Sequence, residues 1–244
     1  MGVEAGQSIL REFWEIFSFK VPNYQFMPAA KRRYWDGTIR LFNLKSRKIY
    51  KGLVPYIEKY CKKNNYDFIS ELNEYDNVIS SNEVDEFLKT LKLPEYIQPR
   101  QYQIDSIAHC IKKQRAVNLL STGSGKSICI YSLCRYFNDK KTLIVVPTKA
   151  LVTQMYSDFE NYSQNDDTWN VDEQCSQIMG GYEKHNLNNV VISTWQSIYE
   201  LPKDWFEEYE MVIVDEVHEA KAKSITSIME KLENAHLRLV LQAR

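Results

Sequence analysis

The sequence predicts an α/β protein in which a parallel sheet with helices on both faces follows a small α+β domain. From Pro94 onward, short apolar runs alternate with helix-patterned stretches, as in parallel sheets. Residues 143–146 are an unbroken apolar run, which is typical of a strand buried on both faces. The expected divisions are a small basic domain at 1–80, a linker with a helix at 81–98 and the parallel-sheet domain at 99–244.

Short elements are predicted within the small domain. Four apolar side chains at helical spacing predict an amphipathic helix: Leu10, Phe13, Trp14 and Phe17. Asp36-Gly37 is a strong turn signal, so we expect a hairpin between 33–35 and 38–42. The remaining elements are a turn at 43–48, a helix opened by Pro55 and a strand at 66–69.

The larger domain is predicted to alternate strands with helices. Its apolar strands are expected at 116–120, 143–146, 190–192, 211–214 and 237–241. Its helices are expected at 101–113 and along apolar stripes that begin at Ile130, Val152 and Ile225. Residues 161–174 are polar and acidic, and we expect them to form a surface excursion.

Composition describes a chain that can bury a core. Its 244 residues are 44% hydrophobic and 26% charged. No run of about eighteen apolar residues exists, so we expect no membrane span. The N-terminus lacks the pattern of a secretory signal, which predicts a cytoplasmic protein. The five cysteines are scattered without a C-x-x-C pair, which favours free thiols over zinc sites or disulfides.

The net charge of −1 conceals a strongly basic segment. Residues 20–63 hold twelve Lys or Arg against two acids, whereas residues 64–96 hold eight acids against two Lys. A local concentration of positive charge attracts phosphate backbones whatever the total charge is. The segment therefore indicates contact with nucleic acid, although a solvated lysine-rich face would have the same composition.

A glycine-rich turn, Ser121-Thr122-Gly123-Ser124-Gly125-Lys126-Ser127, lies between a predicted strand and a predicted helix. The backbone N–H groups of such a turn and the helix N-terminus attract phosphate. Lys126 can reach the β- and γ-phosphates, and the Ser127 hydroxyl can ligate Mg²⁺. The complete pattern has a glycine at position 120, where this chain has Leu120. The turn alone is therefore a weaker signal.

Two acids follow an apolar strand about ninety residues later, in Met211-Val212-Ile213-Val214-Asp215-Glu216-Val217-His218. Ligands of open parallel sheets bind where the strands end. Asp215 is therefore expected to hold the metal, and Glu216 to orient the attacking water. The two segments in this order predict a protein that binds and hydrolyses ATP with Mg²⁺.

The combination of the turn from Thr122 to Ser127 with Asp215-Glu216-Val217-His218 resembles the DExH group of superfamily 2 helicases. The resemblance implies a RecA-like lobe of the P-loop NTPase class. It also implies an ATP-dependent DNA helicase or translocase. His218 would lie between the ATP site and the elements that grip DNA, and a surface histidine is the alternative.

Further segments match the motifs of that family in the expected order. Arg100-Gln101-Tyr102-Gln103 resembles the adenine-reading Q element, which implies nucleotide contacts for Arg100 and Gln103. Pro147-Thr148 resembles part of motif Ia, and Thr194 with Gln196 resembles motif Ib. Both motifs line the nucleic-acid path of the family, where hydroxyl and amide groups can bond phosphates without reading bases. Local helix capping is the alternative for these residues.

The stretch from Tyr34 to Leu41 resembles the small N-terminal domain of bacteriophage UvsW-type DNA helicases. This implies a domain that binds duplex or branched DNA during recombination, replication or repair, in the cytoplasm of a bacterial host. The candidate contacts combine positive charge with an aromatic ring that could stack: Lys31, Arg32, Arg33, Arg40 and Trp35. Trp35 is equally compatible with a place in the core of the domain.

Superfamily 2 motors have a second RecA-like lobe, whose arginines stabilise charge on the γ-phosphate. Residues 239–244 show no motif III, so the sequence is expected to be the first half of a motor, with the second lobe absent. Two other classes stay open: a DNA-binding module that hydrolyses almost nothing, and the motor subunit of a restriction enzyme. No PD-(D/E)xK-like nuclease pattern is present, which counts against the second.

Overall fold

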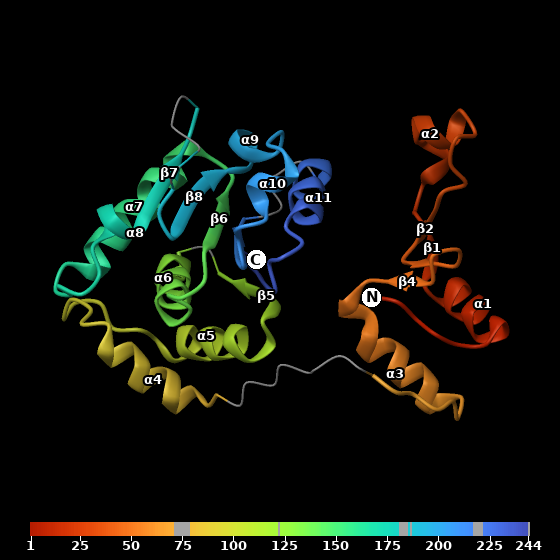
Figure 1. Cartoon of the computed structure of the whole chain (residues 1–244), viewed down its shortest axis with the longest axis horizontal. Coiled ribbons are helices and arrows are strands. Elements are labelled where there is room, and N and C mark those ends of the chain that lie inside the picture. Colours follow the sequence, from red (N-terminus) through yellow and green to blue (C-terminus); the bar gives the residue numbers. More distant parts are fainter. Residues whose placement is uncertain (71–78, 122, 181–184, 186, 217–221, 244) are drawn as a thin grey trace. The chain divides into compact units, whose positions relative to one another are not determined.

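The computed structural model describes residues 1–70, 79–121, 123–180, 185, 187–216 and 222–243. The chain forms two compact units, Met1–Asn73 and Glu74–Arg244 (Figure 1). The smaller unit has one hydrophobic core, and the larger has two, one on each side of its sheet.

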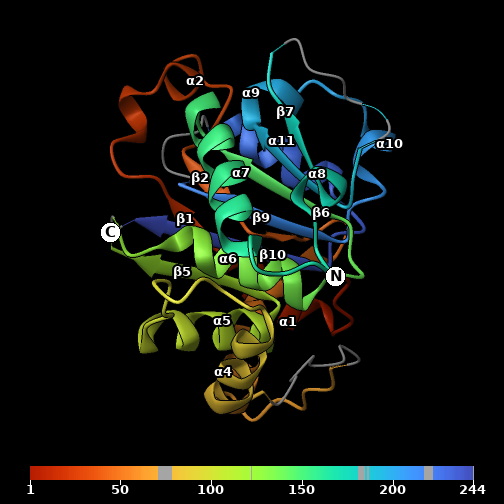
Figure 2. The same cartoon turned by 90° about the vertical axis from the view of Figure 1, so that its left-hand side faces the viewer.

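The larger unit is built on a six-stranded sheet in which every neighbouring pair is parallel (Figure 2). The strand order is β5-β10-β9-β6-β8-β7, which confirms the predicted parallel sheet. In this order only β10 separates β5 from β9, so the ends of β5 and β9 lie near each other. The strands are β5 (Arg115–Leu120), β6 (Thr142–Val146), β7 (Cys175–Ile178), β8 (Val190–Thr194), β9 (Met211–Asp215) and β10 (Leu237–Ala243).

Helices cover both faces of the sheet, as expected. Those from α4 to α7 supply side chains to one core, and those from α9 to α11 supply the other. None of the helices in the described part of the chain is long and apolar enough to cross a membrane. The helices are α4 (Ser81–Thr90), α5 (Gln101–Lys113), α6 (Lys126–Tyr136), α7 (Lys149–Ser163), α8 (Val171–Gln174), α9 (Trp195–Ile198), α10 (Lys203–Phe206) and α11 (Ala222–Lys231).

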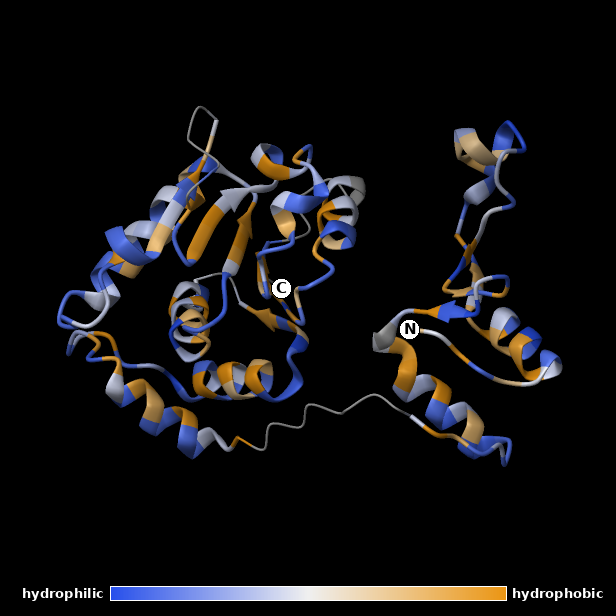
Figure 3. Cartoon of the chain, in the orientation of Figure 1, coloured by the Kyte–Doolittle hydropathy of each residue, from blue (hydrophilic) through white to orange (hydrophobic). Residues whose placement is uncertain are grey.

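Alternate residues of the central strands enter opposite cores. In β6, Ile144 and Val146 pack in the core that α5, α6 and α7 share, whereas Leu143 and Val145 pack in the core of α9 to α11. A strand that is buried on both faces has apolar residues at every position. Strands β6 and β9 therefore carry unbroken apolar runs, at 143–146 and 211–214 (Figure 3).

The segment at 81–98, expected as a linker with a helix, contributes to the larger core. Val84 and Leu88 of α4 are buried there together with Leu91. The helix starts at a reciprocal cap, because the Ser80 hydroxyl accepts from the Glu83 N–H at 3.3 Å and the Glu83 carboxylate accepts from the Ser80 N–H at 2.8 Å. The helix α4 is therefore part of the larger unit's packing.

The smaller unit packs helices around short antiparallel strand pairs, as the α+β prediction requires. Leu10, Phe13 and Phe17 are buried in its core, which confirms the predicted stripe of the first helix. Its elements are α1 (Gln7–Ile16), β1 (Ser18–Lys20), a 3₁₀ turn at Tyr24–Phe26, α2 (Pro28–Lys31), β2 (Thr38–Arg40), β3 (Phe42–Asn43), β4 (Lys48–Ile49), a 3₁₀ turn at Lys51–Leu53 and α3 (Val54–Lys63).

The predicted hairpin at Asp36-Gly37 is wrong. The strand β2 pairs with β1, with Phe19 opposite Ile39, and residues 33–35 form no strand. The Asp36 carboxylate accepts the Thr38 N–H at 3.0 Å. Gly37 has φ 77°, and a Cβ there would lie 2.0 Å from the Tyr24 ring. The turn therefore directs the chain onto β1, and it does not fold the chain back on itself.

The strand predicted at 66–69 is also wrong, because these residues have no regular secondary structure. The Tyr66 hydroxyl instead donates to the Glu12 carboxylate, 3.1 Å from Oε2. The Tyr60 hydroxyl donates to the same oxygen at 2.9 Å. The segment is therefore held by side chains and not by a strand pairing.

Candidate nucleotide and nucleic-acid site

The glycine-rich turn joins the end of β5 to the start of α6. Gly123 and Gly125 have φ 73° and 72°, in the left-handed region that favours glycine. A Cβ at Gly125 would lie 2.6 Å from the Gln103 Nε2. The Ser124 hydroxyl is buried and has no hydrogen-bond partner among the described residues, and Thr122 lies outside them. A tight glycine turn at the N-terminus of an eleven-residue helix is suited to hold phosphate.

The acids predicted for catalysis lie at the same edge of the sheet. Asp215 ends β9 and is 7% exposed, and Glu216 follows it with φ 50°. The Lys126 Nζ lies 2.8 Å from the Glu216 Oε1. The two segments that the sequence paired are thus in direct contact. His218 lies outside the described residues.

The residues present fit a magnesium nucleotide. Mg²⁺ prefers oxygen ligands, and it is usually held by one or two protein groups together with substrate phosphates and water. The Ser127 hydroxyl and the Asp215 carboxylate are donors of that kind. Within the described ranges, no group of three or more His, Cys, Asp or Glu could hold a metal by itself. A metal at this edge would therefore need phosphate oxygens as well.

The Ser127 hydroxyl contacts a side chain of α7. Its Oγ lies 2.8 Å from the Tyr162 hydroxyl oxygen. Burial raises the pKa of the Asp158 carboxyl on the same helix, and the Ser127 hydroxyl opposes that rise. The sequence did not predict a role for Tyr162, because no motif covers this end of α7.

Gln103 is buried against the phosphate loop. Its Oε1 accepts the Arg100 N–H at 2.7 Å, and its Nε2 donates to the Ser124 carbonyl at 2.8 Å. The Tyr102 hydroxyl donates to the same carbonyl at 2.8 Å. The first turn of α5 therefore holds the loop, a role that the sequence did not assign to Tyr102. Adenine contact by Gln103 and the exposed Arg100 stays a prediction.

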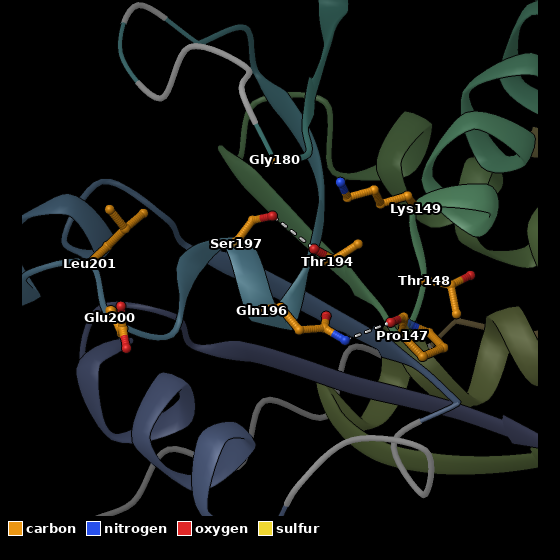
Figure 4. A pocket seen from close by; sticks show the side chains of 9 residues that line it. All are labelled: Pro147, Thr148, Lys149, Gly180, Thr194, Gln196, Ser197, Glu200 and Leu201. Carbon is orange, nitrogen blue, oxygen red and sulfur yellow. Dashed lines mark hydrogen bonds between the residues drawn. The ribbon is translucent and has the colours of Figure 1, made fainter.

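A second part of the site is a cavity of about 730 Å³ at the carboxyl ends of β6 and β8 (Figure 4). The Gln196 Nε2 donates to the Pro147 carbonyl at 3.2 Å. The Thr148 hydroxyl accepts the Leu151 N–H at 3.3 Å, so it caps α7. The structure thus brings together the residues of both predicted nucleic-acid motifs. The cavity is lined by Pro147, Thr148, Lys149, Gly180, Thr194, Gln196, Ser197, Glu200 and Leu201.

Lys149 adds a positive charge to this cavity. It is the first residue of α7, and a Cβ at Gly180 would lie 3.0 Å from its Nζ. Figure 4 shows its side chain extending toward Gly180. An ammonium group at the N-terminus of a fifteen-residue helix favours a bound anion. Lys149 directly follows the Pro147-Thr148 pair of motif Ia, but no sequence pattern distinguished it from other surface lysines.

The five candidate DNA contacts of the smaller unit differ in their surroundings. Lys31, Arg32 and Arg33 are exposed. Arg40 forms an ion pair with Asp36 and lies 5.2 Å from the centroid of the Trp14 ring. Its hydrogen bond holds the pKa of Asp36 well below the ordinary value. The half-buried Trp35 donates its indole N–H to the Thr38 carbonyl at 2.9 Å, so it braces the turn.

The parallel sheet, the glycine-rich loop and the strand-end acids define a RecA-like lobe of the P-loop NTPase class. Residues 96–242 match the family described as the res subunit of type III restriction enzymes, and residues 1–71 match the N-terminal domain of the DNA helicase UvsW. The chain belongs to the first family, and with its N-terminal domain it is a superfamily 2 helicase chain of the UvsW type.

Individual relatives agree with this assignment. The ATP-dependent DNA helicase uvsW of Enterobacteria phage T4 is 34% identical over 245 residues, covering 95% of this chain and 47% of the relative. The DNA 3'-5' translocase XPB2 of Sulfurisphaera tokodaii is 30% identical, covering 62% of this chain and 32% of the relative. The crystal structure of T4 UvsW matches with a TM-score of 0.86 and 32% identity, over 99% of this chain and 50% of that chain. The chain thus spans half or less of the length of these relatives.

Proposed function

We propose that this chain is the N-terminal part of an ATP-dependent DNA helicase or translocase that acts on branched DNA in recombination, replication or repair. The contact between Lys126 and Glu216 carries the proposal, because it joins the phosphate-binding loop to the water-orienting acid. The relative that matches nearly the whole chain is an ATP-dependent DNA helicase. The proposed setting is the cytoplasm of a bacterial host.

The nucleotide chemistry follows from the residues at this edge. Lys126 exchanges the Glu216 carboxylate for oxygens of the β- and γ-phosphates. Ser127 and Asp215 would hold Mg²⁺, which neutralises charge on those phosphates. Glu216, released from Lys126, is then able to orient the attacking water, and Gln103 contacts adenine beside the loop.

Nucleic acid is proposed to follow the cavity of motifs Ia and Ib. Thr194 and Gln196 offer hydroxyl and amide groups, and Lys149 offers a positive charge at a helix N-terminus. Lys31, Arg32 and Arg33 would add phosphate contacts from the smaller unit. Such contacts position DNA and read no sequence, as a motor that moves along DNA requires.

The two rival classes differ from this proposal in what they require. A DNA-binding module would bind DNA and hydrolyse almost nothing, whereas the glycine turn and the pair of Lys126 with Glu216 fit a nucleotide site. A restriction-enzyme motor would share residues 96–242, but the match of residues 1–71 to the UvsW N-terminal domain favours the helicase. A second RecA-like lobe, in the same or another polypeptide, is the proposed partner.

The test is nucleotide and DNA binding by the same preparation. A fluorescent ATP analogue with Mg²⁺ is titrated into the wild-type chain and into Lys126→Ala, and both are titrated with a branched DNA. We expect the wild type to bind both ligands, and the variant to lose nucleotide while keeping DNA. DNA binding without any nucleotide binding by the wild type would instead support the non-catalytic module.

A further inference from the structure

We propose that Tyr162 positions the Ser127 hydroxyl for the metal ion of Mg·ATP. The inference rests on the proposed ATP-binding function and adds to it one residue that belongs to no motif. Tyr162 lies on α7, and Ser127 lies at the start of α6. Their contact thus links the motif Ia helix to the phosphate loop.

The hydrogen-bonding capacity of a hydroxyl explains the arrangement. A serine oxygen carries one hydrogen and two lone pairs. When one lone pair accepts the Tyr162 O–H, the second lone pair stays available to a metal ion. The bond to Tyr162 restricts rotation of the serine side chain. A hydroxyl held in this way can present its second lone pair to a metal without first leaving another rotamer.

Packing holds the tyrosine in place. The Tyr162 ring lies 5.4 Å from the ring of Tyr131, centroid to centroid, and Tyr131 is fully buried in α6. The two helices on which these rings lie are packed against each other. The Tyr162 hydroxyl therefore has little freedom, as a positioning residue requires.

The effect of losing such a supporting contact on metal affinity can be estimated. Removing an outer partner of a metal ligand lowers metal affinity by roughly 10- to 100-fold. Tyr162→Phe removes only the hydroxyl and keeps the ring against Tyr131. We expect it to weaken binding of the nucleotide with Mg²⁺ by about tenfold and to leave binding in EDTA unchanged.

The experiment measures the affinity of the full chain for a fluorescent ATP analogue with Mg²⁺ and, separately, with EDTA. Tyr156→Phe is the matched control, because its hydroxyl lies on the same helix and donates to Asp172 at 2.6 Å. The control is expected to bind as the wild type does in both conditions.

A double variant separates positioning from packing. The Ser127→Ala variant lacks the hydroxyl, so adding Tyr162→Phe to it should not lower the affinity for Mg·ATP any further. A loss of equal size in EDTA, or a loss that persists in the Ser127→Ala background, would assign Tyr162 to packing alone and overturn the inference. Unchanged binding of Mg·ATP by Tyr162→Phe would overturn it as well. If the wild type bound no Mg·ATP, the proposed function itself would fail first.

Discussion

Lys126 and Glu216 form an ion pair across the phosphate site, with 2.8 Å between Nζ and Oε1 and side chains that are 11% and 14% exposed. In the proposed mechanism both groups have a separate task in ATP hydrolysis, so the pair would open when a triphosphate binds. The carboxylate would then compete with the γ-phosphate for the same ammonium. We therefore expect Glu216 to influence nucleotide affinity as well as hydrolysis.

The first prediction concerns Glu216→Gln. Removing the negative charge should raise affinity for Mg·ATP by a few-fold, because Lys126 no longer has a carboxylate to give up. Hydrolysis should fall by roughly 10²- to 10⁴-fold, the range typical of losing a residue that handles the proton of the attacking group. Fluorescence titration and steady-state phosphate release measure the two effects.

Glu208→Gln is the control, because Glu208 forms a comparable 2.8 Å pair with Lys141 away from the phosphate loop. Glu208→Gln should change neither the affinity for Mg·ATP nor the rate of hydrolysis. Weaker ATP binding by Glu216→Gln would contradict the competition, since it would mean that the carboxylate supports the bound state.

The second prediction separates two roles of Gln103. Its amide holds the Ser124 carbonyl, and the family resemblance assigns it to adenine. If Gln103 only contacts adenine, Gln103→Ala should lower the affinity for ATP and leave the affinity for tripolyphosphate unchanged. If it only holds the loop, both ligands should weaken by a similar factor.

Competition titrations with ATP, GTP and tripolyphosphate measure this. We expect both effects, with the larger loss for ATP, because the buried amide cannot leave Ser124 without disturbing the loop. Gln101→Ala is the control, since its amide donates to Asp105 at 2.9 Å on the exposed side of α5. If Gln103→Ala bound each of the three ligands with the same affinity as the wild type, both roles would be contradicted.

The predictable parts of the fold are elements whose sequence pattern matches their burial in the structure. Central strands such as β6 are buried on both faces, so their apolar runs stand out in the sequence. The phosphate loop was predictable because the glycine turn lies between a strand and a helix and is followed in the sequence by the strand-end acids Asp215 and Glu216. Its contact with Glu216 followed from the rule that ligands bind at strand ends.

The missed parts depend on partners that are distant in sequence. The edge strand β7 is four residues long and has only two fully buried side chains, so it shows no apolar run. The turn at Asp36-Gly37 was recognised, but its strand partner is β1, which lies on the far side of an intervening loop and helix. Tyr162 reaches Ser127 across 35 residues, and no spacing rule connects them.

The third prediction concerns an ion pair in the segment after α7. The surface excursion expected at 161–174 is wrong, because Ser163 ends α7 and Asp166, Trp169 and Val171 are buried. The Arg135 guanidinium donates to Asp166 at 2.6 Å and lies beside the rings of Tyr131 and Trp169, 5.5 and 5.1 Å from their centroids. Asp166→Asn leaves the arginine buried without its countercharge. We expect the free energy of unfolding at pH 7 to fall by roughly 3–5 kcal/mol.

The pair of Arg135 with Asp166 also makes the free energy of unfolding depend on pH. Burial alone would raise the pKa of Asp166, but hydrogen bonds from Thr168 and Arg135 outweigh it and lower the pKa from 3.8 to about 2. A carboxyl group whose pKa is lower in the folded state than in the unfolded state stabilises the fold at pH values above its unfolded-state pKa. This contribution, about 2 kcal/mol, is lost as the pH falls from about 4 through about 2.

Urea unfolding followed by tryptophan fluorescence, at pH 7 and near pH 3, measures both effects. The difference between wild type and Asp166→Asn should narrow at the lower pH. Asp139→Asn, which removes an exposed pair with Lys140, should cost less than about 1 kcal/mol. A difference that is independent of pH would show that the carboxylate charge contributes nothing.

The last prediction concerns the basic surface of the smaller unit. Arg32 and Arg33 follow α2 and are exposed, so their charges are available to phosphates. Reversing both to Glu in the full chain should weaken binding about equally for unrelated duplex sequences, because backbone contacts carry no base information. The log–log salt slope should become shallower by about one unit for each lost contact. The matched control reverses Lys62 and Lys63, which lie in the same unit at the end of α3 and outside the proposed surface. Equal losses from the two reversals would show that total charge alone governs binding, and no loss from Arg32 and Arg33 would remove this surface from the DNA path.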